Sequence, residues 1–314
     1  MINNSLKTIL KKEHAKKTKN HNYKKNKRNY IYKNTHTQPK IDLIISWISL
    51  NQFRSNTCFR ETGRGSSGII NRFRDNFELK YSLRSYYKYA KWLNKIHIIL
   101  GRNSNKPKWL KNHPKINIIH ESQLYNPVQE NSETKKLFYT KIKNLSDYFL
   151  TSDDDFFLRS KLFKNELVNN QKPILNSVHG RKHDIDRDGD AHIPLIWKKA
   201  DYEKAIEDFT ISEYNFFLNM GCKRKNPFVL IKKNLLLKDK IYLGKIKGPD
   251  KFINHRNMKN LESELQDILD NPKYKYICIN DDFSTSDTRI YNDQMKIIYN
   301  FYNKLYPEKA PWEF

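Results

Sequence analysis

Short apolar runs alternate with stretches of helical periodicity across the first half of the sequence, and this alternation restricts the possible fold more than any other feature. The β-rich runs occupy residues 41–47, 96–100, 116–120 and 148–152. The helical stretches cover residues 75–90 and 133–145. Strands that alternate with helices predict an α/β fold with a mainly parallel sheet covered by helices on both faces. In such sheets, ligands bind beyond the carboxyl ends of the strands.

The second half of the chain is less regular, but its pattern still predicts folded structure. Apolar positions predict helices over residues 197–209, 212–220, 258–269 and 286–305, and a strand over residues 276–280. We therefore expect one folded domain over residues 39–314, with a first half at 39–160 and a second half at 161–314.

Residues 1–38 differ in composition from the rest of the chain. The first 40 residues contain 12 Lys or Arg against one acid, Glu13, and so carry +11 of the net charge of +25. A segment this basic and this poor in apolar residues cannot bury enough surface to fold. We expect a disordered basic arm, which either contacts anionic surfaces weakly or is a solvated tail without a specific role.

The cysteines and the apolar runs exclude several classes of protein. Cys58, Cys222 and Cys278 have no metal-type spacing and are odd in number, which argues against a zinc cluster or a disulfide framework. The basic N-terminus lacks the apolar region of a secretory signal. The longest apolar run, residues 41–50, is too short to span a bilayer. The sequence therefore favours a cytoplasmic protein without a transmembrane segment.

Three adjacent aspartates follow the β-rich run at residues 148–152. Asp153, Asp154 and Asp155 repel one another, and their charge is costly at the edge of a core unless something neutralises it. Carboxylate oxygens suit Mg²⁺ or Mn²⁺, and such a cation would bridge a substrate diphosphate. The sequence therefore predicts a metal site at the end of this strand. The alternative interpretation is an acidic turn.

Two arginines stand just before the expected helix at residues 75–90. Arg72 and Arg74 precede Asp75, and Glu78 follows Asp75 at the spacing of a capping box. A guanidinium binds phosphate oxygens with two parallel hydrogen bonds, and a helix N-terminus adds backbone donors. The pattern indicates a phosphate site. Surface arginines beside a simple helix cap are the alternative.

The same stretch resembles a known family. Residues 72–85 read R-F-R-D-N-F-E-L-K-Y-S-L-R-S, which is similar to the second conserved region of Stealth proteins, typically R-x-R-D-N-G-E-L-R-Y-S-L-R-S. The resemblance continues from Asn131-Ser132 to residue 150, after which the family's N-D-D falls on the three aspartates. Phe77 stands where the family has Gly, Glu133 where it has His, and Asp153 where it has Asn. Residues 41–47, His192 and residues 277–282 resemble the family's other regions.

The resemblance implies a glycosyltransferase-A-like or Rossmann-like fold and a sugar-phosphate transferase. The donor would be a nucleotide sugar bound by residues 39–160, and the acceptor would be a glycan on the side of residues 161–314. The implied catalytic residues are Asp75, His192 and Arg74, with His192 or Asp75 as the base. The implied substrate-binding residues are Arg72, Asn76, Glu78, Arg84, Asn131, Ser132 and Asp282. The implied metal ligands are Asp153, Asp154 and Asp155, holding Mg²⁺ or Mn²⁺.

Two other functions compete with this one. Asp153 and Asp155 form a D-x-D pattern, which in glycosyltransferases holds the metal and the diphosphate while a nucleoside diphosphate leaves. The net charge of +25 would also suit a nucleic-acid-binding protein. Against that third hypothesis, the charge of residues 41–314 is diffuse, no nucleic-acid-binding motif is present, and the acids gather at strand ends, where they would repel a phosphate backbone. We therefore expect no specific nucleic-acid partner. His192 on its own would equally suit a structural role.

Overall fold

The computed structural model describes residues 39–49, 74–101, 103–125, 133–175, 193–219, 226–244, 249–254, 260–280 and 287–314. The main sheet of this part has five strands in the order β3-β2-β1-β4-β8. These are β1 (Ile41–Trp47), β2 (Ile96–Leu100), β3 (Ile116–His120), β4 (Tyr148–Ser152) and β8 (Leu195–Lys198). All neighbours pair in parallel except β4 and β8. The predicted α/β fold with a mainly parallel sheet is confirmed.

The strand order reverses at β1. The chain passes from β1 to β2 and β3 on one side, and β4 then pairs with the other side of β1, with Ile45 opposite Ser152. At such a switch point the connections leave in opposite directions, and a crevice opens beyond the carboxyl ends of the two strands. The three aspartates directly follow β4, so the sequence places them at this crevice.

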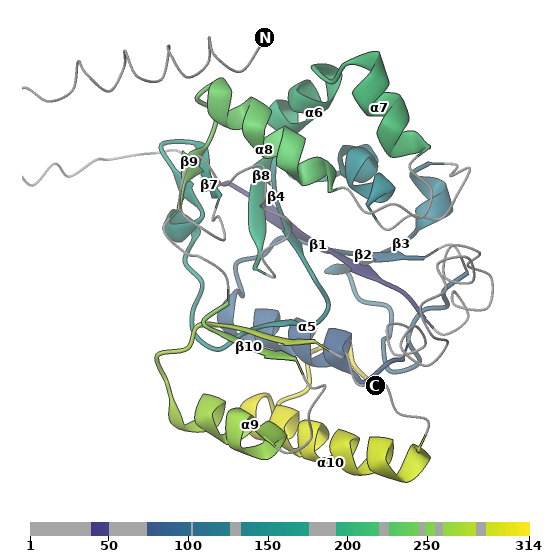
Figure 1. Ribbon diagram of the computed structural model, residues 1–314, viewed down its shortest axis with the longest axis vertical. Coiled ribbons are helices and arrows are strands. Elements are labelled where there is room, and N and C mark those ends of the chain that lie inside the picture. The colour runs from purple at the N-terminus through teal and green to yellow at the C-terminus, as the bar shows by residue number, and fades with distance from the viewer. Residues whose placement is uncertain are drawn as a thin grey trace, which may run out of the picture. The chain divides into compact units, whose positions relative to one another are not determined.

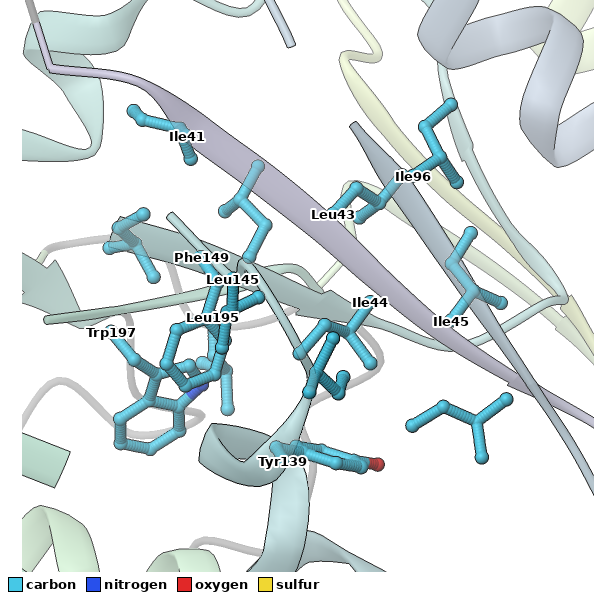
Figure 2. Packing of buried hydrophobic residues seen from close by; sticks show 14 of the residues in the cluster. Ile41, Leu43, Ile44, Ile45, Ile96, Tyr139, Leu145, Phe149, Leu195 and Trp197 are labelled. Atoms are coloured by element: carbon cyan, nitrogen blue, oxygen red, sulfur yellow. The ribbon is translucent and has the colours of Figure 1, made fainter. Parts of the chain in front are cut away.

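Helices cover both faces of the main sheet (Figure 1). On one face lies α5 (Glu78–Tyr89), and on the other lie the 3-10 helix η3 (Thr134–Lys141), α6 (Lys199–Glu207) and α8 (Pro227–Leu237), with α7 (Ile211–Leu218) beside them. Figure 2 shows Ile44 of β1 on the side of Tyr139, which belongs to η3. Strands buried on both faces explain why these segments read as continuous apolar runs.

A second layer lies beyond α5 (Figure 1). Its sheet has the order β10-β11-β5, formed by β10 (Lys251–Asn254), β11 (Tyr276–Asn280) and β5 (Phe156–Leu158). The helices α9 (Leu261–Asp270) and α10 (Thr288–Leu305) pack on it through a separate apolar cluster that includes Phe157, Ile277 and Tyr302. The strand β5 begins at Phe156, directly after Asp155, so the three aspartates connect the main sheet to this second sheet.

Smaller elements complete the described part of the chain. A third sheet has the order β6-β7-β9, from β6 (Val168–Asn169), β7 (Lys172–Leu175) and β9 (Tyr242–Leu243). Two short 3-10 helices are η2 (Glu121–Gln123) and η4 (Lys164–Glu166). None of the described helices is both long and apolar enough to cross a membrane.

Several sequence predictions need correction. Residues 197 and 198 continue a strand instead of starting a helix, because Trp197 pairs with Phe149 at the sheet edge and is fully buried. The helix predicted at residues 133–145 is the 3-10 helix η3. The two predicted halves share both larger sheets, since β8 pairs with β4 and β11 pairs with β5. The boundary between arm and domain stays a prediction, since residues 1–38 are outside the described part.

Candidate active site

Both ends of the aspartate segment are anchored in the core. Before it, the Tyr86 hydroxyl of α5 donates to Ser152 Oγ at 2.9 Å. After it, the Ile279 N–H of β11 donates to the Asp155 carbonyl oxygen at 3.0 Å. The backbone that carries the three carboxylates is therefore held at the junction of the two sheets.

The electrostatics of this segment are those of crowded acids. Burial, reinforced by the charge of Asp153, raises the pKa of Asp154 to about 7. Burial and the charges of Asp153 and Asp154 also raise the pKa of Asp155, which a hydrogen bond from the buried thiol of Cys278 lowers in part. Asp153 thus makes both Asp154 and Asp155 harder to ionise, and a bound cation would remove that cost.

The residues present suit a divalent cation that shares its ligands with a substrate. No group of three His, Cys, Asp or Glu side chains among the described residues is arranged to hold a metal by itself. Mg²⁺ usually takes one or two protein carboxylates together with substrate phosphates. Asp153 and Asp154 could supply the carboxylates, whereas Asp155 is tied to Cys278 in the second layer. The predicted Mg²⁺ or Mn²⁺ site stays a prediction.

The N-terminal edge of α5 lies next to the aspartates. The charge of Asp75 is near enough to contribute to the raised pKa of Asp154. The pKa of Asp75 is itself raised, mainly by burial, although hydrogen bonds with Phe77 and Trp109 and the charge of Lys80 lower it in part. Its side chain nevertheless remains exposed to solvent. The Asp75 carboxylate is therefore both near Asp154 and accessible to a substrate.

The predicted capping box takes a different form. The N-cap of α5 is Phe77, which has no side-chain cap. Asp75 Oδ1 accepts from the Phe77 N–H at 2.9 Å, and Glu78 Oε2 accepts from the Asn76 N–H at 2.8 Å. Two local hydrogen bonds therefore fix the segment that precedes the helix. Glu78 thus has a structural partner, and its predicted contact with substrate stays a prediction.

Arg74 and Asn76 both face α10. The Arg74 guanidinium lies 4.2 Å from the centre of the Tyr291 ring, and the Tyr291 hydroxyl donates to Asn76 Oδ1. Asn76 is buried, whereas Arg74 is partly exposed. Asn76 therefore holds α5 against α10 and is poorly placed for the predicted contact with substrate. Arg74, directly before Asp75 in the chain, keeps an exposed part.

The predicted role of Arg84 as a phosphate clamp does not fit its surroundings. Its side chain is only 5% exposed. Its Nε and Nη2 donate to the two carboxylate oxygens of Glu313 at 2.8 and 2.7 Å, and Nη1 donates to the Tyr306 carbonyl oxygen at 2.7 Å. The Arg84 guanidinium, which was expected to bind phosphate, binds the Glu313 carboxylate of the same chain.

Lys135 is a candidate site residue that the sequence did not reveal. It belongs to η3, its side chain is 5% exposed, and its positive charge lowers the pKa of Asp154 in part. In the sequence it is one of two adjacent lysines, and nothing distinguishes it from Lys136, which pairs with Glu133 at 2.9 Å. Only the packing of η3 against the sheet shows which lysine approaches the aspartates.

The remaining predicted residues lie outside the described part of the chain. These are Arg72, Asn131, Ser132, His192 and Asp282. Their predicted roles stay predictions.

Two conserved regions of one family match this chain. Stealth protein conserved region 2 matches residues 72–175, and conserved region 4 matches residues 266–314. In the structure these two regions are in contact, because β5 pairs with β11 and Arg84 binds Glu313. The matched segments therefore form one packed unit around the aspartates.

Curated relatives carry related names. The capsular polysaccharide phosphotransferase WcwK of Streptococcus pneumoniae is 25% identical over 87% of this chain and 98% of its own length. The capsular polysaccharide phosphotransferase cps1A of Actinobacillus pleuropneumoniae is 32% identical over 42% of this chain and 39% of its own length. An exopolysaccharide phosphotransferase of Nocardia farcinica is 34% identical over 37% of this chain and 24% of its own length.

Among solved structures, the galactosyltransferase LgtC, crystallised with donor and acceptor sugar analogues, matches 86% of this chain and 98% of its own with 10% identity and a TM-score of 0.46. A relative that aligns along nearly its whole length, with 25% identity, agrees with the two family-model matches. The chain carries conserved regions 2 and 4 of Stealth proteins, in this order and in contact with each other.

Proposed function

We propose that this transferase moves a sugar-1-phosphate from a nucleotide-diphospho-sugar to a hydroxyl group of a glycan acceptor. One observation carries the proposal. A crowded group of carboxylates, with Lys135 and Asp75 beside it, lies beyond β4 where the strand order of a parallel sheet reverses. This is where such sheets bind nucleotide ligands. The names of the relatives, which are phosphotransferases of capsular polysaccharide, support the same reaction.

The reaction is a substitution at phosphorus. The acceptor oxygen attacks the phosphorus nearest the sugar, the bond to the bridging oxygen breaks, and a nucleoside monophosphate leaves with that oxygen. The acceptor hydroxyl loses one proton to a base. Catalysis of this kind is mainly positioning and charge stabilisation. A Mg²⁺ or Mn²⁺ ion held by Asp153 and Asp154 would neutralise the negative charge of the diphosphate.

The chain's own residues supply the remaining functions. Asp75 is exposed and its pKa is raised, mainly by burial, which makes its carboxylate a stronger base than an ordinary aspartate and a candidate to take the proton of the acceptor hydroxyl. His192, predicted for the same role, is the second candidate base. Lys135 would place a buried positive charge beside the donor phosphates, and Arg74 would contact them from the N-terminal edge of α5. The buried Arg84 is not part of the proposed phosphate site.

The identity of the released nucleotide tests the proposal. The full chain is incubated with Mn²⁺, a panel of nucleotide sugars and a panel of oligosaccharide acceptors, and the products are separated by chromatography and examined by ³¹P NMR. We expect a nucleoside monophosphate and a product that retains one phosphorus. A nucleoside diphosphate and a product without phosphorus would establish glycosyl transfer instead. The Asp154→Asn variant is the control for background hydrolysis. Because the donor is a nucleotide sugar, we keep the prediction that the protein works in the cytoplasm.

A further inference from the structure

Phe77 has a backbone conformation that a bulky residue seldom adopts. It is the N-cap of α5, with φ 64° and ψ 16°, in the left-handed region that favours glycine. The left-handed conformation costs an L-residue about 1–2 kcal/mol. Burial of the ring offsets little of this cost, since the side chain is 37% exposed. At this position the Stealth pattern has Gly, so the turn itself does not require a ring.

The Phe77 ring is one part of a continuous aromatic surface. It lies 5.8 Å from the ring of Tyr299, which belongs to α10 and is 39% exposed. Tyr299 in turn lies edge-on to Tyr81 at 6.0 Å. On the other side, the Lys80 ammonium lies 5.5 Å from the centre of the Phe77 ring. The two exposed rings therefore form a small apolar surface with a cation at its border.

This aromatic surface lies next to Asp75, the proposed base. The Phe77 N–H donates to Asp75 Oδ1 at 2.9 Å, so the ring and the carboxylate share one rigid turn. The charge of Asp75 acts on Asp154, so the aspartates lie near the same turn. Tyr291, one side of which is covered by Arg74, lies two helical turns before Tyr299 on α10. A molecule resting on Phe77 and Tyr299 is thus beside Asp75.

We propose that Phe77 and Tyr299 form the platform on which the acceptor sugar of this enzyme stacks. A pyranose has a face of C–H bonds and a rim of hydroxyl groups, and it matches a small aromatic surface bordered by charged groups. Such rings add rigid contact area at low entropic cost. A sugar held there can direct a hydroxyl to Asp75. The proposal rests on the proposed function, because it assigns the acceptor to that reaction.

Three variants of the full chain test the platform. Phe77→Gly removes one ring and suits the left-handed backbone, so its melting temperature should stay close to that of the wild type. Tyr299→Ala removes the other ring, and Tyr299→Phe keeps it. We expect the KM for the acceptor to rise about tenfold in Phe77→Gly and Tyr299→Ala, roughly 1.4 kcal/mol, while the KM for the donor stays unchanged. Tyr299→Phe should behave like the wild type. The control is Phe163→Ala, which removes another exposed ring, 54% exposed, at the N-cap of η4.

A binding measurement separates this proposal from the reaction itself. Saturation-transfer NMR with the methyl glycosides of galactose, glucose and mannose reports contact between sugar C–H groups and the protein without any turnover. We expect a signal for at least one glycoside with the wild type and with Phe163→Ala, and its loss in Phe77→Gly and Tyr299→Ala. If both ring variants lose the signal but the wild type releases a nucleoside diphosphate, the platform is supported and glycosyl transfer replaces the proposed reaction. No signal with the wild type, or an unchanged acceptor KM in both ring variants, would overturn the platform.

Discussion

Asp42 and Asp154 are carboxylates at opposite ends of the same two strands, and their surroundings differ in one respect. Asp42 stands near the start of β1 and is fully buried. Asn94 Nδ2, the Lys95 N–H and the Ser146 N–H donate to it at 2.9, 3.0 and 2.8 Å, and His97 Nε2 lies 3.1 Å away. Burial acts to raise its pKa, but the hydrogen bonds from His97, Ser146 and Asn94 outweigh burial and lower it.

Asp154 lies just beyond the end of β4, and there the effects that raise the pKa outweigh those that lower it. Burial raises its pKa to about 7, and its nearest charged neighbours include two further acids, Asp153 and Asp75. Folding alone would not favour such a cluster, because buried charges are stable only when they are paired. Burial acts to raise the pKa of both carboxylates, so burial alone does not account for the opposite shifts. What distinguishes them is whether the protein itself provides the donors.

The largest expected effect is on catalysis. Replacing Asp154 by Asn removes the charge that the proposed cation needs, and transfer should fall on the order of 10⁴-fold, more than 5 kcal/mol in the barrier. The same change removes a repelled charge, so the melting temperature in EDTA should not fall. Steady-state kinetics with Mn²⁺ and a thermal melt check the two halves of this prediction. Transfer that survives the substitution, or that is insensitive to EDTA, would contradict a metal held by Asp154.

Asp42 should respond in the reverse manner. Asp42→Ala leaves the Asn94 amide, two backbone N–H groups and His97 without their acceptor, and it should lower the free energy of unfolding by about 3–5 kcal/mol. Chemical denaturation measures this loss. The turnover number of the fraction that remains folded should match that of the wild type, because Asp42 lies at the end of the sheet away from the aspartates. A large fall in turnover without a loss of stability would refute the structural role.

Arg84 and Arg74 should show the same contrast between an effect on stability and an effect on turnover. Arg84→Ala leaves Glu313 buried without its bidentate partner and should lower the free energy of unfolding by about 3 kcal/mol. Arg74→Ala removes a partly exposed cation beside Tyr291 and should lower turnover by roughly tenfold, more than it weakens donor binding, with little change in stability. Denaturation curves and kinetics of both variants measure the contrast. If Arg84→Ala lost turnover but not stability, the assignment of the two residues would have to be exchanged.

The sequence predicted the site better where the chain is locally regular than where distant segments meet. Strands β1, β2, β3, β4 and β11 have the predicted bounds, because an apolar run bounded by turn residues is a local signal. The position of the three aspartates at the carboxyl end of β4 followed from the same local reading. The placement of Asp75 beside them depended on the family resemblance, and the structure brings the two segments together.

The sequence predictions failed where a feature depends on residues that are distant in the sequence. An arginine on the expected helix indicates a phosphate ligand or an ion pair equally well, and only the fold brings Glu313, 229 residues away, to Arg84. Lys135 has no local signal for the same reason. The strand β5 was missed because three residues, Phe156–Leu158, are too few to show a period, and they form a strand by pairing with β11. In each case the deciding partner is remote in sequence.

The smallest expected effect, and the one that isolates Asp42, is on stability in acid. The pKa of Asp42 is lowered in the folded protein, so its ionised form contributes stability above the pKa of an unfolded aspartate, about 3.9. This contribution should be lost as the pH falls through the folded pKa. The melting temperature should therefore decline below pH 4 more steeply in the wild type than in Asp42→Asn, which has no carboxyl group to titrate. Thermal melts between pH 6 and pH 2.5 give both slopes. Equal slopes would mean that other carboxylates control acid unfolding, and the hydrogen bonds of Asp42 would then contribute to stability without depending on its charge.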